Sequence, residues 1–219
     1  MWQILRKDLR IERRTGEILS SMLLLSVLII LVFAFTLEPS RLRGPEILGG
    51  LLWATLLFSG TLALNRSFLL ERESGAWSAL ALAPIDRGSI YLGKLLANLV
   101  VLLIGASVLL PLMILLLGTR ELQLNWLLPV SLSLGMLGFA AIGTLFSAMA
   151  SGTRAREVLM PLLTFPLLAP LLIAASRTTT AGLTGEPLEA VQSWLMLLGA
   201  FDLVFTVAGW LFFDYVLED

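Results

Sequence analysis

The sequence predicts an all-α, polytopic membrane protein with six transmembrane helices. Hydrophobic residues make up 58% of the chain, charged residues 14%, and the mean hydropathy is +0.91. Soluble domains have about 45–50% apolar and about 25% charged residues, so this chain needs lipid as the solvent for most of its surface. The charged residues gather between long apolar runs, which is typical of membrane spans joined by polar connections.

The six apolar runs lie at residues 18–37, 47–65, 90–117, 126–150, 158–176 and 194–213. At about 1.5 Å per residue each can cross roughly 30 Å of hydrocarbon, the second only just. The first is too long for a cleavable signal peptide and lacks a small-x-small exit. We expect residues 1–17 to be an N-terminal arm and residues 18–219 to be a single transmembrane domain.

The lysines and arginines predict the orientation of the spans. Most of them lie in the N-terminal arm, in the connection between the second and third spans, and in the loop after the fourth span. The opposite side carries Arg41, Arg43, Arg120 and Arg177. Positive charge favours the cytoplasmic side, so we expect both termini in the cytoplasm.

The N-terminal arm has the pattern of a basic amphipathic helix. On a helical wheel five basic residues share one face and three apolar residues share the adjoining one: Arg6, Lys7, Arg10, Arg13 and Arg14, then Trp2, Leu5 and Leu9. Such a helix would lie along the inner leaflet, held by anionic headgroups, and Gly16 would let the chain turn into the first span. Topogenic charge without a helix is the alternative.

The polar connection at residues 66–89 is a candidate docking segment. Charged clusters bracket a helix-like run at residues 76–83, which Pro84 ends because a residue before proline avoids the α region. We expect this run to dock on a cytoplasmic partner, with Asn65 as a possible helix cap; a helix lying in the lipid interface is the alternative. The candidate docking residues are Glu71, Arg72, Glu73, Trp77, Leu80, Pro84, Asp86 and Arg87.

Asp202 and three prolines are candidates for a function inside the membrane. Asp202 is the only ionisable group well inside a span, so functional and structural roles both stay open. Pro161, Pro166 and Pro170 predict a fifth span that is strongly kinked or locally unwound.

Small residues repeat along the fourth span, including Ser131, Gly135, Gly138 and Gly143. They allow close helix approach, for which packing within the chain is favoured over a dimer seam.

Catalytic and metal sites are not expected. The chain has no His and no Cys, and its net charge of −1 argues against a nucleic-acid partner. Residues 88–94 nearly match the phosphate-binding motif G-x-x-x-x-G-K-[ST], but Leu95 replaces the hydroxyl residue and the segment opens a span. We therefore interpret Lys94 as a side chain that snorkels to the inner interface.

Two sequence blocks resemble the haem exporter protein B (CcmB) family, membrane subunits of ABC-2 type in bacterial cytochrome c maturation. The first block is Glu71-Arg72-Glu73-Ser-Gly75-Ala76 with Leu82-Ala83-Pro84-Ile85-Asp86-Arg87 and the start of the third span. The second is Ser151-Gly-Thr-Arg154-Ala-Arg156-Glu157 with Leu159-Met160-Pro161 and the two later prolines. The resemblance covers essentially the whole chain.

The resemblance implies a multi-pass subunit of the bacterial inner membrane that works with a separate cytoplasmic ABC ATPase. ATP would bind to that partner, haem would be the substrate, and other cytochrome c maturation membrane proteins would join the complex. Without His or Cys this chain has no strong axial ligand for haem, which favours mechanical coupling over haem holding. An ABC-2 exporter of a lipid, glycan or drug is the alternative.

Two further interpretations concern how the protein assembles and which class of membrane protein it is. A half-transporter of six spans predicts a homodimer or a pairing with a related membrane subunit, with Ser131 and Gly135 at the seam and Asp202 facing a shared cavity. A secondary transporter or membrane scaffold is less favoured, because no internal repeat accompanies Asp202.

Overall fold

A computed structural model describes residues 1–36, 45–73, 86–117, 122–150 and 156–216; within these, the side chains of residues 45–46, 72–73, 150, 156–163 and 214–216 are left aside. The described residues form helices and connections and contain no strand, which confirms the all-α class. The helices are α1 (Trp2–Thr15), α2 (Glu17–Thr36), α4 (Pro45–Glu73), α6 (Arg87–Leu117), α7 (Leu127–Ala150), α8 (Arg156–Thr184) and α9 (Leu188–Val216).

Five of these helices are long and apolar enough to cross a membrane. The stretches that qualify among the described residues are Glu17–Thr36, Ile47–Glu71, Arg87–Leu117, Leu127–Met149 and Leu188–Phe213. The chain is therefore a multi-pass membrane protein. The remaining long helix, α8, has 29 residues and runs between the same two ends of the bundle.

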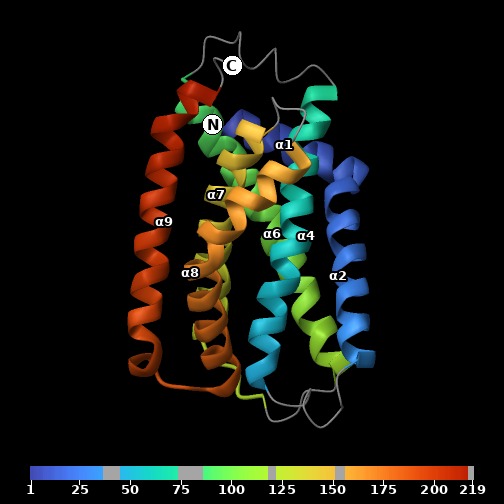
Figure 1. Ribbon diagram of the computed structural model, residues 1–219, viewed down its shortest axis with the longest axis vertical. Coiled ribbons are helices and arrows are strands. Elements are labelled where there is room, and N and C mark those ends of the chain that lie inside the picture. The colour runs from blue at the N-terminus through green and yellow to red at the C-terminus, as the bar shows by residue number, and fades with distance from the viewer. Residues whose placement is uncertain (37–44, 74–85, 118–121, 151–155, 217–219) are drawn as a thin grey trace.

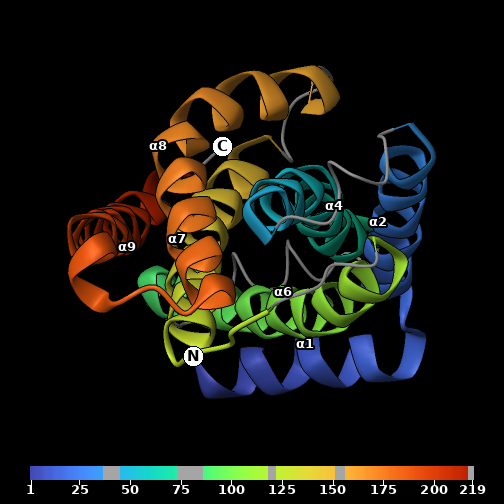
Figure 2. The ribbon, with the colours of Figure 1, turned by 90° about the horizontal axis from the view of Figure 1, so that it is seen from below.

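The helices form an upright bundle with α1 lying across one end (Figure 1), which we call the α1 end. Seen along the bundle, α1 follows the first part of α6 and reaches α2 (Figure 2). The last turns of α4 and α9 and the first turns of α6 also lie at the α1 end (Figure 1). Within the bundle α7 is central, because it packs against α4, α6, α8 and α9.

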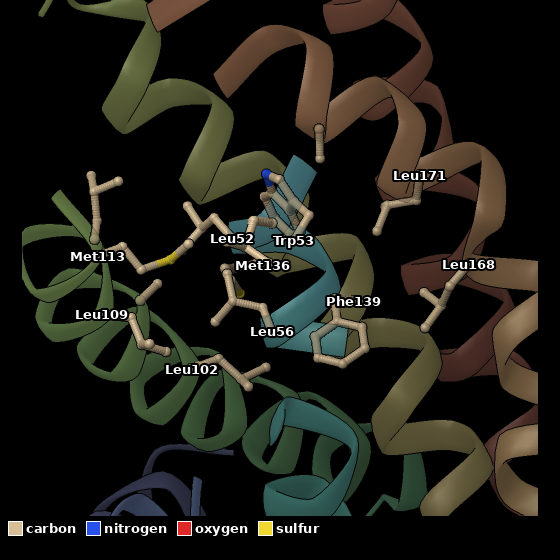
Figure 3. Packing of buried hydrophobic residues seen from close by; sticks show 14 of the residues in the cluster. Leu52, Trp53, Leu56, Leu102, Leu109, Met113, Met136, Phe139, Leu168 and Leu171 are labelled. Atoms are coloured by element: carbon tan, nitrogen blue, oxygen red, sulfur yellow. The ribbon is translucent and has the colours of Figure 1, made fainter. Parts of the chain in front are cut away.

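The core between these helices is filled by large apolar side chains (Figure 3). Trp53 from α4 and Phe139 from α7 are buried between the leucines of α6 and α8. Trp53 also donates a hydrogen bond from Nε1 to Thr179 Oγ1 of α8, at 2.9 Å. In lipid, apolar burial adds little to helix association, so close packing and bonds such as this one hold the helices together.

The small residues of α7 serve packing within the chain. A Cβ atom on Gly135 would lie 2.3 Å from the Trp53 ring, and one on Gly143 would lie 2.2 Å from Leu64, both on α4. Ser131 is fully buried. The predicted intramolecular packing is confirmed, whereas the expectation that Ser131 and Gly135 form a dimer seam is wrong, because Ser131 is fully buried and Gly135 lies against Trp53 of α4 and Ala175 of α8.

The prolines bend α8 but do not unwind it. The helix is continuous from Arg156 to Thr184, through Pro161, Pro166 and Pro170, and its first turns run obliquely before it descends beside α9 (Figure 1). Of the two alternatives that the prolines predicted, the structure shows the bend and not the local unwinding. A proline ring forces a bend and removes one donor, but neighbouring turns can remain helical.

The turn between α1 and α2 is built by Gly16 and Glu12. Gly16 adopts the left-handed conformation (φ 64°) that ends α1, and its N–H donates to the carbonyl of Glu12 at 2.7 Å. The Glu12 carboxylate then accepts hydrogen bonds from the N–H groups of Ile18 (3.3 Å) and Leu19 (2.8 Å) at the start of α2. The helical reading of the arm and the turn at Gly16 are confirmed.

The second span continues as one helix far beyond its apolar run. Asn65 lies inside α4 and does not cap a separate docking helix, so that expectation is wrong. Hydropathy marks where the hydrocarbon ends, and polar residues can extend a helix further where they find partners, as Arg66 does with Glu17 at 2.9 Å.

Candidate functional site

Four charged side chains meet where α1, α4 and α6 converge at the α1 end. Lys7 and Asp8 come from α1, Glu71 from the last turn of α4, and Lys94 from the second turn of α6. The Lys7 ammonium lies 3.0 Å from Asp8 Oδ1, and the Lys94 ammonium lies 2.9 Å from Asp8 Oδ2. Both ammonium groups also pair with Oε1 of Glu71. We call Lys7, Asp8, Glu71 and Lys94 the charge cluster.

Glycine at position 93 lets α1 approach α6 closely enough for the cluster to form. A Cβ atom there would lie 2.9 Å from the Met1 carbonyl oxygen and 3.0 Å from Cβ of Ile4. Ile4 is buried against the first turns of α6. This contact places the next turn of α1, with Lys7 and Asp8, opposite Lys94. The near-match to a nucleotide-binding motif is thus part of a helix, and its second glycine is a packing contact.

The cluster is balanced in charge, and three of its side chains are largely buried: Lys94, Glu71 and Asp8 are 1%, 7% and 13% exposed, whereas Lys7 is 36% exposed. Lys94 is 1% exposed, and its ammonium lies 5.4 Å from the centre of the buried Phe68 ring. The expectation that Lys94 snorkels to the interface is therefore wrong, because two carboxylates bind it inside the protein. Each cation contacts both anions, so removing any one member leaves a buried charge without its full set of partners.

Lys7 stays charged in this setting. Burial lowers the pKa of its ammonium group, but the pairing with Glu71 and Asp8 outweighs burial, and the net pKa is raised above 10.5. A raised lysine pKa means that the stabilising interaction is complete at neutral pH and is lost only as pH rises through that value. The Lys7 ammonium is thus a charged member of the cluster at neutral pH.

A cavity of about 260 Å³ adjoins the cluster between α1, α2, α4 and α6. Glu17 and Ser67 help to line it together with the cluster itself. Next to it, the pair Arg66–Glu17 joins α4 to α2, with both side chains more than a third exposed. Exposed pairs of this kind contribute little to stability, so the buried cluster is the stronger tie.

The candidate docking residues fall into three groups. Arg72 and Glu73 end α4, Arg87 begins α6, and the Asp86 carboxylate accepts a hydrogen bond from the N–H of Ser89 at 2.8 Å, capping α6. Glu71 faces inward, into the charge cluster. Trp77, Leu80 and Pro84 lie outside the described residues.

Asp202 lies between α7, α8 and α9 and is 5% exposed. Its Oδ1 lies against Gly138, and neither carboxylate oxygen has a side-chain partner among the described residues. The expectation that Asp202 faces a shared central cavity is wrong, because the three helices of its own chain enclose it. Asp202 and the charge cluster are separate features, on different helices.

The described part of the chain contains no group of three or more acidic, His or Cys side chains that could hold a metal ion. The charge cluster instead joins the two helix ends that flank residues 74–85 to each other and to α1. Such an arrangement can fix helices in one geometry and pass on a displacement, and it offers no group poised for chemistry on a substrate.

Sequence reasoning missed the partnership of Lys7, Asp8 and Lys94. One signal was an acid, Asp8, within an otherwise basic arm, and another was a lone lysine just inside a span. Neither indicates which residues meet, because the contacts join positions far apart in the chain.

Comparison with known proteins extends these observations. The family model described as CcmB protein matches residues 1–212. A relative from Rhodobacter capsulatus, named Heme exporter protein B, is 30% identical over 195 residues, which is 89% of each chain. Proteins of the same name from Pseudomonas aeruginosa (28% over 203 residues, 93% of this chain and 91% of the relative) and Escherichia coli K12 (29% over 209 residues, 91% and 89%) are similar too. The similarity therefore runs from α1 through most of α9.

Proposed function

The chain belongs to the CcmB family, and on this basis we propose that it is the membrane subunit of an ABC-type haem export system that serves c-type cytochrome biogenesis. The observation that carries the proposal is similarity over nearly the whole chain to proteins named Heme exporter protein B. The three relatives share that name, so the alternative of a lipid, glycan or drug exporter has no support from them.

In this proposal the protein crosses the bacterial inner membrane six times, with α8 as the sixth spanning helix beside the five that qualify by length and hydropathy. The α1 end faces the cytoplasm, which places both termini there. Support comes from the lysines and arginines of α1, of the last turns of α4 and of the first turns of α6, which lie at this end. The exposed arginines of α1 would lie at the inner leaflet: Arg6, Arg10, Arg13 and Arg14.

Residues 66–89 would dock on a separate cytoplasmic ABC ATPase, which binds ATP. This chain would have no ATPase site of its own. The proposal is supported by the two flanking helix ends, which meet at the α1 end and are joined there through Glu71 and Lys94. ATP hydrolysis would then drive movement of haem, or release of a haem chaperone, by mechanical coupling. The absence of His and Cys from the chain favours coupling over direct haem ligation.

A homodimer would complete the exporter, in contact with other membrane proteins of cytochrome c maturation. A second copy would pack on α2 or α9, which leave large apolar side chains such as Leu24 and Leu203 uncovered by the rest of the chain and open to either lipid or a partner helix.

Co-purification with the ATPase tests the proposed docking. The double substitution Trp77→Asp/Leu80→Asp should reduce recovery of the ATPase in mild detergent without lowering the amount of protein in the membrane. Leu124→Asp/Trp126→Asp is the matched control, because it places the same charges on exposed residues at the opposite end. Normal ATPase recovery with the first variant would place the docking site elsewhere.

Haem attachment tests the function itself. In a bacterium that lacks its own family member, this chain, expressed with its ATPase, should restore covalent haem attachment to a c-type cytochrome. A protein that inserts and binds the ATPase but restores no holocytochrome would contradict the assignment to haem export.

A further inference from the structure

We propose that the charge cluster makes α1 a moving part of the coupling machinery, with Lys94 as its positioning residue. The cluster would hold α1, the end of α4 and the start of α6 as one rigid unit, so that a displacement of the docking segment carries α1 with it. This inference rests on the proposed function, because it assumes that an ATPase acts on residues 66–89.

The position of the cluster relative to the docking segment is the first argument. Glu71 lies in the last turn of α4 and Lys94 in the second turn of α6. Their ion pair therefore joins the ends of the two helices that the docking segment connects. A force on the segment therefore acts on both helices together.

The second argument is the way α1 enters the same contact. Lys7 and Asp8 complete an alternating arrangement in which each cation contacts both anions. The close contact of Gly93 with the first turn of α1 adds a rigid steric contact beside the ionic one. No movement of the α4–α6 junction can leave α1 behind without separating these charges in a buried place.

The third argument extends the unit to α2. The Glu12 carboxylate binds backbone N–H groups of Ile18 and Leu19, so the end of α1 is fixed to the first turn of α2. A tilt of α1 is thereby passed to a helix that leaves most of its surface outside the bundle.

A contribution to stability alone would not require charges here. Buried ion pairs are often no more stabilising than apolar residues of similar volume, whereas removing one partner is strongly unfavourable. What the alternating charges supply is a single geometry for three helices, which is the property that a positioning device needs.

Distances measured in the intact complex test the rigid unit directly. Spin labels on Ile11→Cys of α1 and Ser89→Cys of α6 can be placed without removing native cysteines, since the chain has none. In the ATPase complex the distance between the labels should be the same without nucleotide and with ATP trapped. A distance that changes with nucleotide overturns the inference but leaves the proposed function standing.

Substitution of Lys94 tests its positioning role. In Lys94→Met the ATPase should still co-purify, the label distance should broaden, and haem attached per ATP hydrolysed should fall about tenfold. Glu17→Gln is the matched control, because it removes the negative charge from the exposed neighbouring pair with Arg66 and should change none of these readouts. Normal coupling in Lys94→Met would overturn the inference.

Inverting the whole cluster guards against a simple folding defect. The variant Lys7→Glu/Asp8→Lys/Glu71→Lys/Lys94→Glu keeps every pair of opposite charges and the net charge. It should recover membrane levels, the narrow label distance and most of the coupling. Recovered membrane levels with coupling still lost would overturn the inference. Loss of the ATPase from the unsubstituted complex would overturn the proposed function and the inference with it.

Discussion

The carboxylate of Asp202 on α9 occupies space that exists because position 138 on α7 is glycine. A Cβ atom at Gly138 would lie 2.5 Å from Asp202 Oδ1 and 2.3 Å from Leu171 Cδ1 of α8. Three helices therefore meet at a point where one has no side chain and another carries an acid. Asp202 is a local contact of its own chain, and its role depends on the packing around it.

Gly138→Ala should lower the free energy of unfolding by about 1–3 kcal/mol, because the added methyl group overpacks a site bounded by two other helices. Unfolding of the purified protein in detergent, followed by tryptophan fluorescence, measures the change. Gly199→Ala on α9 is the matched control, since a Cβ there meets nothing within 4 Å. Equal effects of the two substitutions would contradict the packing described for Gly138.

Shortening the Asp202 side chain should relieve part of the destabilisation that Gly138→Ala causes. In a double-mutant cycle, Asp202→Ala should make Gly138→Ala less destabilising than it is alone, while the clash with Leu171 persists. Strict additivity would show that the two residues do not compete for the same space.

Thr179→Val should destabilise the protein by about 0.5–2 kcal/mol, because it leaves the buried Nε1–H of Trp53 without its acceptor. Thr178→Val is the control: it is equally buried and adjacent, but its hydroxyl donates to Ala174 O in its own helix. The same unfolding measurement should show the larger loss for Thr179→Val, and the reverse order would contradict the α4–α8 bond.

Cysteine cross-linking in membranes should reveal a second copy of the chain. Single cysteines at exposed positions of α2 (Leu24, Phe35) and α9 (Leu203, Trp210) should include one face that cross-links above the collision background. Ser131→Cys should not cross-link, because position 131 is buried. If no exposed position cross-links while the ATPase still binds, a different membrane subunit must complete the exporter.

The protein purified without partners should carry no stoichiometric haem. The chain has neither His nor Cys, and its remaining candidates for iron ligands are Met and Tyr, of which Tyr91 is buried with its hydroxyl donating to the carbonyl of Ala141. Absorption spectra after gel filtration provide the measurement. A haem band at one haem per chain would support direct transport by this subunit.

Five apolar helices long enough to span, the helix of the arm and the turn at Gly16 could be predicted from sequence because they depend on local properties. Apolar runs of sufficient length, a basic face and a glycine at a helix end each act over a few neighbouring residues. The ends of the helices could not be predicted as well, since α4 continues through Arg66 and Glu71, whose partners lie on other helices.

The same distinction between local properties and contacts across the chain applies to the candidate site. The connection at residues 66–89 stood out by its polarity, and Asp202 by its depth in a span. The environment of each depended on contacts between distant parts of the chain: Glu71 turned inward to two lysines, and Asp202 lay against a glycine. The prediction that Lys94 snorkels was wrong for this reason. A lone lysine near the end of a span does not indicate that two carboxylates from other helices bind it.

The contacts of α1 also set an order of events during synthesis. Lys7 and Asp8 leave the ribosome early, whereas Glu71, Gly93 and Lys94 follow only after several seconds at about 5–20 residues per second. During that interval α1 lacks the helices that carry Glu71, Gly93 and Lys94, and its available partner is the first turn of α2, which Glu12 binds. The first helix to be made can therefore complete its contacts only after α6, which carries Gly93 and Lys94, has been made.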